Sequence, residues 1–204
     1  MTTLRLLRAA DYRRMAWKNG GGITTEIARD ANGGEAFDWR ISIAEIAQDG
    51  DFSIFSDVDR ELMLLDGGGV ELLIGSDEPV SLMRRYQKHA FPGEAPVSCR
   101  LLDGPTRDFN LMVRRGRYDA ELLARPIVGA QLLFPAAATT WLVHVVHGHV
   151  SVKEQTDLPR AEGGETLVIE FTQSGGSPLV LNGAGELVMV RLARKGRVDV
   201  GTSG

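Results

Sequence analysis

Nine side chains in the first half of the chain have the residue types and spacing of a binding site for a small anionic molecule. Two are arginines, whose planar guanidinium groups can each bind a carboxylate in a fixed orientation. Amide and hydroxyl groups offer further hydrogen bonds, and a tryptophan offers an apolar wall, which is the usual mixture in a small-molecule pocket. The nine candidate ligand-binding residues are Trp17, Asn19, Thr24, Glu26, Arg40, Ser42, Arg60, Asp108 and Asn110.

The spacing of these residues predicts that they share one face of their strands. Side chains of a strand alternate between its two faces, so residues two apart point the same way. A run of three glycines at 20–22 indicates a bend or a close approach of the backbone to something bound. We therefore expect a pocket, with Trp39 as a second apolar wall, rather than the solvated face of a sheet. The pairs that are two apart are Thr24 with Glu26, Arg40 with Ser42, and Asp108 with Asn110.

The two acidic candidates, Glu26 and Asp108, have alternative roles that the sequence leaves open. They can bind an ammonium or imidazole nitrogen of the ligand, or they can hold the arginines in place. Two carboxylates can also act as acid and base when burial separates their pKa values. No serine, cysteine or lysine lies in a recognisable triad or elbow pattern. We therefore assign no catalytic residue and expect a binding protein rather than an enzyme.

Apolar and polar residues alternate with a period of two through most of the chain, which predicts an all-β protein. Residues 37–44 are one example, and similar runs recur with Gly, Asp or Pro between them. Only residues 9–17 and 118–124 are expected to form helical turns. Hairpins that turn at glycine are predicted at 62–72 and 142–152, and their similarity indicates an internal duplication.

Repeated antiparallel strands with glycine turns favour a bicupin, in which two jelly-roll-like β units pack as one compact protein. The first cupin-like unit, residues 1–116, is expected to carry the ligand pocket. The second, residues 117–204, is expected to be mainly structural, with Trp141, Phe171 and Leu181 in its core. Its glycine-rich end, 195–204, has no assigned function.

Composition excludes several classes of partner. The chain has 204 residues, 43% of them hydrophobic, and a formal net charge of -4, which argues against nucleic-acid binding. Its single cysteine, Cys99, rules out an internal disulfide and is expected to be packed in a strand. Residues 1–14 are expected to be neither a signal peptide nor a membrane-spanning segment, because they contain four arginines and only short apolar runs. We therefore expect a cytoplasmic protein without a nucleic-acid or membrane partner.

No metal or cofactor is expected. The usual cupin metal site needs a His-x-His pair and a glutamate before a hairpin glycine and a further histidine on a later strand, and the windows 52–61 and 134–141 before the two predicted hairpins contain no histidine. The only histidine cluster is His144, His147 and His149. These are expected to be exposed residues near a turn, with His144 on the opposite strand face, so they do not converge as a closed metal site requires.

Five motifs of the first half follow one another in a characteristic order. They are WKNGGG at 17–22 with Thr24 and Glu26, FDWRISIA at 37–44, DG at 49–50 with Phe52, Ser53 and Phe55, DR at 59–60, and DFN at 108–110. In this order they resemble the HutD/Ves family. The resemblance implies a cytoplasmic bicupin that, in its HutD branch, is associated with histidine utilisation and has a regulatory or ligand-sensing role.

The resemblance and the candidate site together favour a metal-independent protein that senses or buffers an anionic metabolite of histidine catabolism. Urocanate or an N-substituted glutamate is the ligand that the family context implies. One alternative is a metal-free hydrolase or isomerase that uses Glu26 or Asp108 with Arg40 as the anion clamp. Another is a protein-interaction module. Because cupins often pair through sheet edges or faces, a homodimer is the default expectation.

Overall fold

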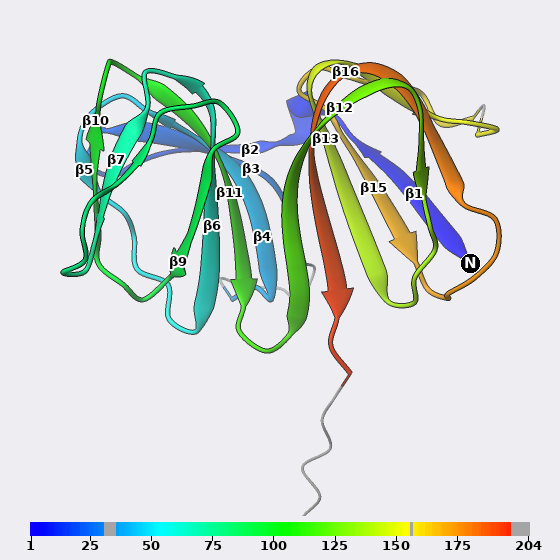
Figure 1. Ribbon diagram of the computed structural model, residues 1–204, viewed down its shortest axis with the longest axis horizontal. Coiled ribbons are helices and arrows are strands. Elements are labelled where there is room, and N and C mark those ends of the chain that lie inside the picture. The colour runs from blue at the N-terminus through cyan, green and yellow to red at the C-terminus, as the bar shows by residue number, and fades with distance from the viewer. Residues whose placement is uncertain (31–35, 156, 197–204) are drawn as a thin grey trace, which may run out of the picture.

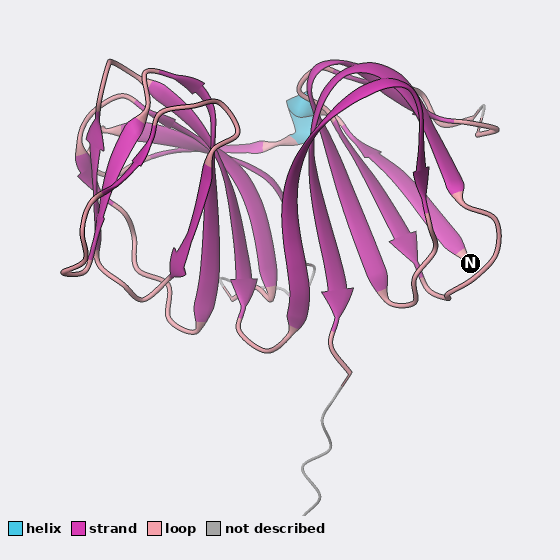
Figure 2. Ribbon diagram, viewed as in Figure 1, coloured by secondary structure: helices cyan, strands magenta, loops and turns pink. Residues whose placement is uncertain are grey.

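The computed structural model describes residues 1–30, 36–155 and 157–196, and almost all of the regular secondary structure in these residues is β-strand (Figures 1 and 2). The all-β prediction is therefore confirmed. Positions 197–204 of the glycine-rich end lie outside the described residues. No helix in the described part of the chain is long and apolar enough to cross a membrane. The strands are β1 (Thr2–Leu7), β2 (Arg13–Ala16), β3 (Gly22–Arg29), β4 (Trp39–Ile46), β5 (Gly50–Asp51), β6 (Val58–Gly67), β7 (Val70–Ile74), β8 (Val80–Leu82), β9 (Lys88–Pro92), β10 (Val97–Leu101), β11 (Thr106–Arg114), β12 (Tyr118–Leu133), β13 (Thr139–Val152), β14 (Ala161–Glu162), β15 (Thr166–Phe171) and β16 (Leu179–Arg194).

The strands form three antiparallel sheets arranged in two arched halves that lie side by side (Figure 1). The central sheet has the order β2-β3-β4-β11-β6-β9, and a smaller outer sheet, β5-β10-β7-β8, belongs to the same half. The other half is built on one sheet of order β1-β15-β13-β16-β12, with β14 beside β13. The order β4-β11-β6-β9 of the central sheet is matched by β12-β16-β13-β15 in the other half, as an internal duplication would produce.

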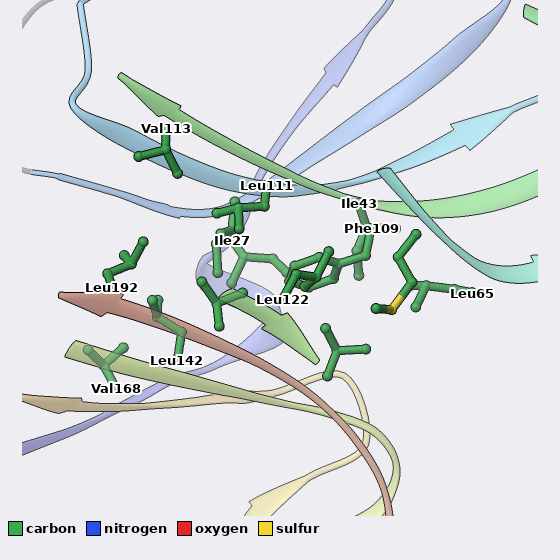
Figure 3. Packing of buried hydrophobic residues seen from close by; sticks show 14 residues of the cluster. Ile27, Ile43, Leu65, Phe109, Leu111, Val113, Leu122, Leu142, Val168 and Leu192 are labelled. Atoms are coloured by element: carbon green, nitrogen blue, oxygen red, sulfur yellow. The ribbon is translucent and has the colours of Figure 1, made fainter. Parts of the chain in front are cut away.

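The central sheet is buried on both faces, because each face packs on a different layer. Its odd-numbered residues, such as Ile43, Phe109 and Leu65, pack against Leu142 and Leu192 of the other half (Figure 3). Its even-numbered residues face the outer sheet, where a second apolar cluster contains Cys99 as a buried strand residue, as predicted. A third cluster lies within the other half and contains Phe171 and Leu181, with Trp141 packed partly buried against it, which confirms that prediction.

Both predicted glycine hairpins are wrong, because the strands that flank the glycines do not pair with each other. β6 pairs with β9 and β11, whereas β7 pairs with β8 and β10, so the glycines at 67–69 carry the chain from the central sheet to the outer sheet. β13 runs without a turn through Gly148, which has a φ of 84°. The period of two predicts strands correctly but does not show which strands become neighbours.

The helical turns expected at 9–17 and 118–124 are mostly strand. A single 3-10 turn spans Ala9–Asp11, and β2 follows it. The segment 118–124 begins β12, whose pairing with β16 supplies the backbone hydrogen bonds. The division of the chain into two units near residue 116 stays a prediction. One strand does not follow this division, because β1 precedes residue 116 but pairs along its whole length with β15 of the other half (Figure 1).

His144 is buried between the two halves, not exposed near a turn as expected. The residue is 3% exposed, and the centre of its ring lies 5.8 Å from the ring centre of Phe109 in the central sheet. Its Nδ1 lies 3.0 Å from Thr166 Oγ1, which is also 2.7 Å from the hydroxyl of Tyr12. Burial, and to a smaller extent the positive charge of Arg107, lower the pKa of His144 to about 4.

This burial predicts that acid weakens the packing between the halves. The unfolded chain takes up a proton at His144 near pH 6.5, whereas the folded chain does so only near pH 4, so stability is lost as the pH falls through this window. The loss is on the order of 3 kcal/mol for a shift of this size. His144→Leu should remove it. Urea unfolding at a series of pH values should show the variant gaining stability relative to the parent below about pH 6.5, and a constant difference would contradict the burial argument.

Candidate functional site

The face of the central sheet that is turned toward the outer sheet carries the polar candidate residues in rows that run across neighbouring strands. The register places Arg40, Met112 and Arg60 side by side on β4, β11 and β6. The next row along the same face contains Glu26, Ser42, Asn110 and Leu62, from β3, β4, β11 and β6. The row beyond it contains Thr24, Ala44, Asp108 and Leu64. Alternation along four neighbouring strands therefore gathers residues that lie as much as 88 positions apart, from Thr24 to Met112.

A cavity of about 480 Å³ opens on this face, a volume in the range of ordinary small-molecule sites. Seven of the nine candidate residues line it: Trp17, Asn19, Thr24, Arg40, Ser42, Arg60 and Asn110. Glu26 and Asp108 do not line it. That any of the nine contacts a ligand stays a prediction. The lining residues that the sequence did not assign to the pocket are Met15, Ala16, Lys18, Ala44, Asp51, Phe52, Ser53, Phe55, Leu62 and Met112.

Arg60 is a buried cation without a carboxylate partner. It is 5% exposed, and within the described residues no carboxylate oxygen lies within ion-pair distance of its guanidinium group. The guanidinium carbon lies 5.2, 5.7 and 5.0 Å from the ring centres of Phe52, Phe55 and Phe91. Its Nη1 donates a hydrogen bond of 3.3 Å to the carbonyl of Ser53, but its Nε has no partner. Burial, and secondarily the charge of Arg40, lower its pKa to about 10, so it remains charged at neutral pH.

The charge of Arg40, by contrast, is neutralised by the carboxylate of Glu26. Its Nε donates to Glu26 Oε2 at 2.6 Å, and both side chains are nearly buried. Glu26 Oε1 also lies 3.8 Å from Arg29 Nε. Of the two roles left open for Glu26, the structure therefore shows the one in which it holds an arginine in place. The cavity keeps one uncompensated guanidinium, that of Arg60.

The glycines at 20–22 serve the protein's own packing at this site. A Cβ on Gly22 would lie 2.5 Å from the carbonyl oxygen of Glu45 and 3.2 Å from the ring of Trp17. Because Gly22 has no side chain, the Trp17 indole can lie over the strand and donate from Nε1 to Thr24 Oγ1 at 2.8 Å. The edge of the same indole meets Phe52, with ring centres 6.3 Å apart. The three-glycine run therefore positions one wall of the cavity.

Trp39 was expected as the other wall, and this prediction is wrong. Trp39 is adjacent to Arg40 on β4, so its side chain points to the opposite face of the sheet. There it packs against the apolar cluster between the halves. The walls that the prediction missed are Phe52 and Phe55, which precede Arg60 in the chain. Their proximity to Arg60 in the sequence could have indicated that they belong to the pocket. Because this loop has no alternating pattern, however, the sequence does not show the direction in which the two rings point.

Two buried acceptors on β11 lack partners. Asn110, 6% exposed, lines the cavity, and its Oδ1 has no hydrogen bond. Asp108 lies deeper and is fully buried; its Oδ2 accepts a hydrogen bond of 3.3 Å from Thr106, while its Oδ1 is unpaired. Burial raises the pKa of Asp108 to about 7. Among the described residues, no group of three or more His, Cys, Asp or Glu side chains is placed to hold a metal ion.

Comparisons with known proteins agree with this architecture. A family model described as HutD matches residues 9–189. A Pseudomonas putida protein of 21.2 kDa, encoded in the region 3′ of hutC, is 44% identical over 153 residues, which cover 74% of this chain and 78% of the relative. Protein Ves of Cronobacter sakazakii is 37% identical over 162 residues, which cover 74% of this chain and 83% of that protein.

Solved structures show the same fold. HutD from Pseudomonas fluorescens SBW25 superimposes with a TM-score of 0.79 at 37% identity, covering 95% of this chain and all of that one. YhhW from Escherichia coli has a TM-score of 0.70 at 11% identity, covering 94% of this chain and 97% of that one, and shares the fold alone. The predicted cupin-like architecture of two units is confirmed, although its sheets do not close into barrels.

The burial of Asp108 predicts a pH dependence of opposite sign to that of His144. The folded chain holds a proton on Asp108 up to about pH 7, whereas the unfolded chain releases it near pH 3.8, so stability falls as the pH rises between these values. Asp108→Asn should remove a loss on the order of 4 kcal/mol.

In the parent protein, Asp108 and His144 change the stability in opposite directions as the pH rises. The informative quantity is therefore the free energy of unfolding of the variant minus that of the parent. For Asp108→Asn, urea unfolding should show this difference increasing from about pH 4 to pH 7. A difference that is flat or decreases over this interval would mean that the carboxyl is ionised in the folded protein.

Proposed function

Because the chain belongs to the HutD family, we propose that it binds a small anionic metabolite of histidine catabolism in the cavity of the central sheet and acts as a sensor or buffer of that metabolite. One observation carries the proposal: the cavity contains a buried guanidinium, that of Arg60, which no described carboxylate neutralises. A buried cation without a partner is costly, and a bound anion removes that cost.

The surroundings of Arg60 favour a carboxylate as this anion. A guanidinium binds a carboxylate through charge-assisted hydrogen bonds, and Arg60 lines the cavity. The three phenyl rings around the group exclude water, which strengthens the electrostatic attraction. Arg60 itself provides the positive charge for recognition, so the proposed binding is metal-independent.

The rest of the cavity suits a short organic body attached to that carboxylate. Trp17, Phe52, Phe55 and Met112 supply apolar walls, and Ser42 and Asn110 supply polar groups. Urocanate and N-substituted glutamates have this combination of carboxylate, short chain and polar nitrogen. They are the ligands we propose, because the family is associated with histidine utilisation. On this proposal the protein works in the cytoplasm, where such metabolites are formed.

Binding is favoured over turnover by the positions of the two acids. Glu26 is engaged by Arg40, and neither Glu26 nor Asp108 lines the cavity. A general acid or base must come within hydrogen-bond reach of the proton that it transfers. Of the described lining residues, Lys18 and Asp51 are the titratable groups other than the two arginines, and both are exposed; Asp51 accepts a hydrogen bond from Ser98. The hydrolase or isomerase alternative would have to use one of these exposed groups.

Replacing Arg60 by methionine should abolish ligand binding without unfolding the protein. Removing an unpaired buried charge in favour of an apolar side chain is often neutral or stabilising. In a thermal-shift screen with urocanate, N-formylglutamate, formiminoglutamate, histidine and glutamate, a ligand at about 100 times its Kd stabilises the parent by roughly 2.7 kcal/mol. For a chain of this size the melting temperature should rise by about 5 to 10 °C, and Arg60→Met should show no rise.

Arg100→Met is the matched control, because Arg100 is an exposed arginine of the outer sheet that pairs with Glu71. It should keep the full shift. A shift that persists in Arg60→Met would place the anion elsewhere. If no carboxylate shifts the parent, the metabolite hypothesis fails, and a complex with another protein that forms without any metabolite becomes the function to test.

A further inference from the structure

Arg40 lines the same cavity as Arg60 and has hydrogen-bond donors that the fold does not use. Its Nε donates to Glu26 Oε2 at 2.6 Å, but its two Nη atoms make no hydrogen bond to any described residue. Neither Nη atom belongs to the buried side-chain atoms that lack a partner in the described chain. The Nη atoms of Arg40 are therefore accessible, and a molecule in the cavity can accept hydrogen bonds from them.

Arg60 also keeps an accessible donor. Its Nη1 donates to the carbonyl of Ser53 and its Nε is buried, whereas its Nη2 has no partner among the described residues and is not one of the buried unpaired atoms. The register places Arg40, Met112 and Arg60 in one row, so the two arginines are anchored on the same face about 10 Å apart, two strand spacings. One cavity therefore presents two guanidinium groups with free donors.

The charges at the Arg40 end of this row leave room for a second anion. Glu26 contacts two arginines, because its Oε1 lies 3.8 Å from Arg29 Nε while its Oε2 accepts from Arg40. Two cations and one carboxylate leave a net positive charge there. A guanidinium whose Nε is engaged can still bind a further acceptor, because its N–H groups form a fork. Glu26 is then a positioning residue that fixes the orientation of the Arg40 guanidinium.

We infer that the cavity recognises a dicarboxylate with a short carbon chain, with one carboxylate bound at Arg60 and the other at the Nη donors of Arg40. This inference rests on the proposed function and narrows it, since N-substituted glutamates have the second carboxylate and urocanate does not. A ligand with a single carboxylate forgoes one set of charge-assisted hydrogen bonds, which are stronger than those between neutral groups. The dicarboxylate therefore binds more tightly.

Ligands that differ in one carboxylate test the inference by isothermal titration calorimetry. N-formylglutamate is compared with N-formylglutamine and N-formylisoglutamine, in which an uncharged amide of similar shape replaces one carboxylate or the other. At about pH 7.5 both carboxylates of N-formylglutamate are ionised. In the parent protein each monoamide should have a Kd at least about tenfold higher than that of N-formylglutamate.

A double variant assigns this preference to Arg40. Arg40→Met combined with Glu26→Gln removes the cation without leaving its acid unpaired, an exchange that proteins often tolerate. In this variant the monoamide that keeps the carboxylate at Arg60 should bind as tightly as N-formylglutamate, within about twofold. Arg29→Met is the matched control, because Arg29 also contacts Glu26 but does not line the cavity. It should retain the preference of the parent.

The outcomes separate the inference from the proposed function. If a monoamide binds the parent as tightly as N-formylglutamate and both are lost in Arg60→Met, the anion site is correct and the second carboxylate site is wrong. The inference also fails if urocanate binds and N-formylglutamate does not. A preference that survives in the double variant, or that disappears in Arg29→Met, would mean that contact with Arg40 is not its source. If no carboxylate binds the parent, the proposed function and the inference fail together.

Discussion

Burial of the central sheet on both faces is the constraint on which the rest of the molecule depends. One face forms the apolar core between the halves, and the other faces the outer sheet and the cavity. A strand buried on both sides cannot shift by one residue, because the shift would exchange Phe109 with Asn110 and put polar groups into the core. The same apolar packing that holds the halves together therefore fixes which side chains reach the cavity.

This arrangement explains why an uncompensated charge can persist in the interior. The stability of the fold is supplied by apolar clusters in which residues such as Ile41, Leu62 and Phe109 are fully buried. Against that background the protein can tolerate Arg60 and Asn110 with unpaired atoms, and such exceptions to local consistency are expected at functional sites. Arg40 needs no such tolerance, because Glu26 neutralises its charge.

The sequence was sufficient to predict the all-β class, the parity of the polar pairs and the burial of Cys99, because each depends on local alternation. Alternation also contained the information that Trp39 lies opposite Arg40, although we expected both at the pocket. The pairing between distant strands could not be predicted from the sequence. This pairing determines that Glu26 neutralises Arg40 and leaves Arg60 without a carboxylate partner. It also places β6 and β7 in different sheets and buries His144 between the halves. These are properties of tertiary contacts with no local signature.

The pairing of β1 with β15 also constrains how the chain reaches this structure. Thr2 pairs with Phe171, so β1 and its partner strand β15 are about 170 residues apart in the sequence. Until that partner is synthesised, the hydrogen-bonding groups of β1 have no strand to pair with, and contacts of such sequence separation form slowly. β1 can therefore join the sheet of the second half only after β15 has been synthesised, and the two halves are joined by this strand as well as by their apolar interface.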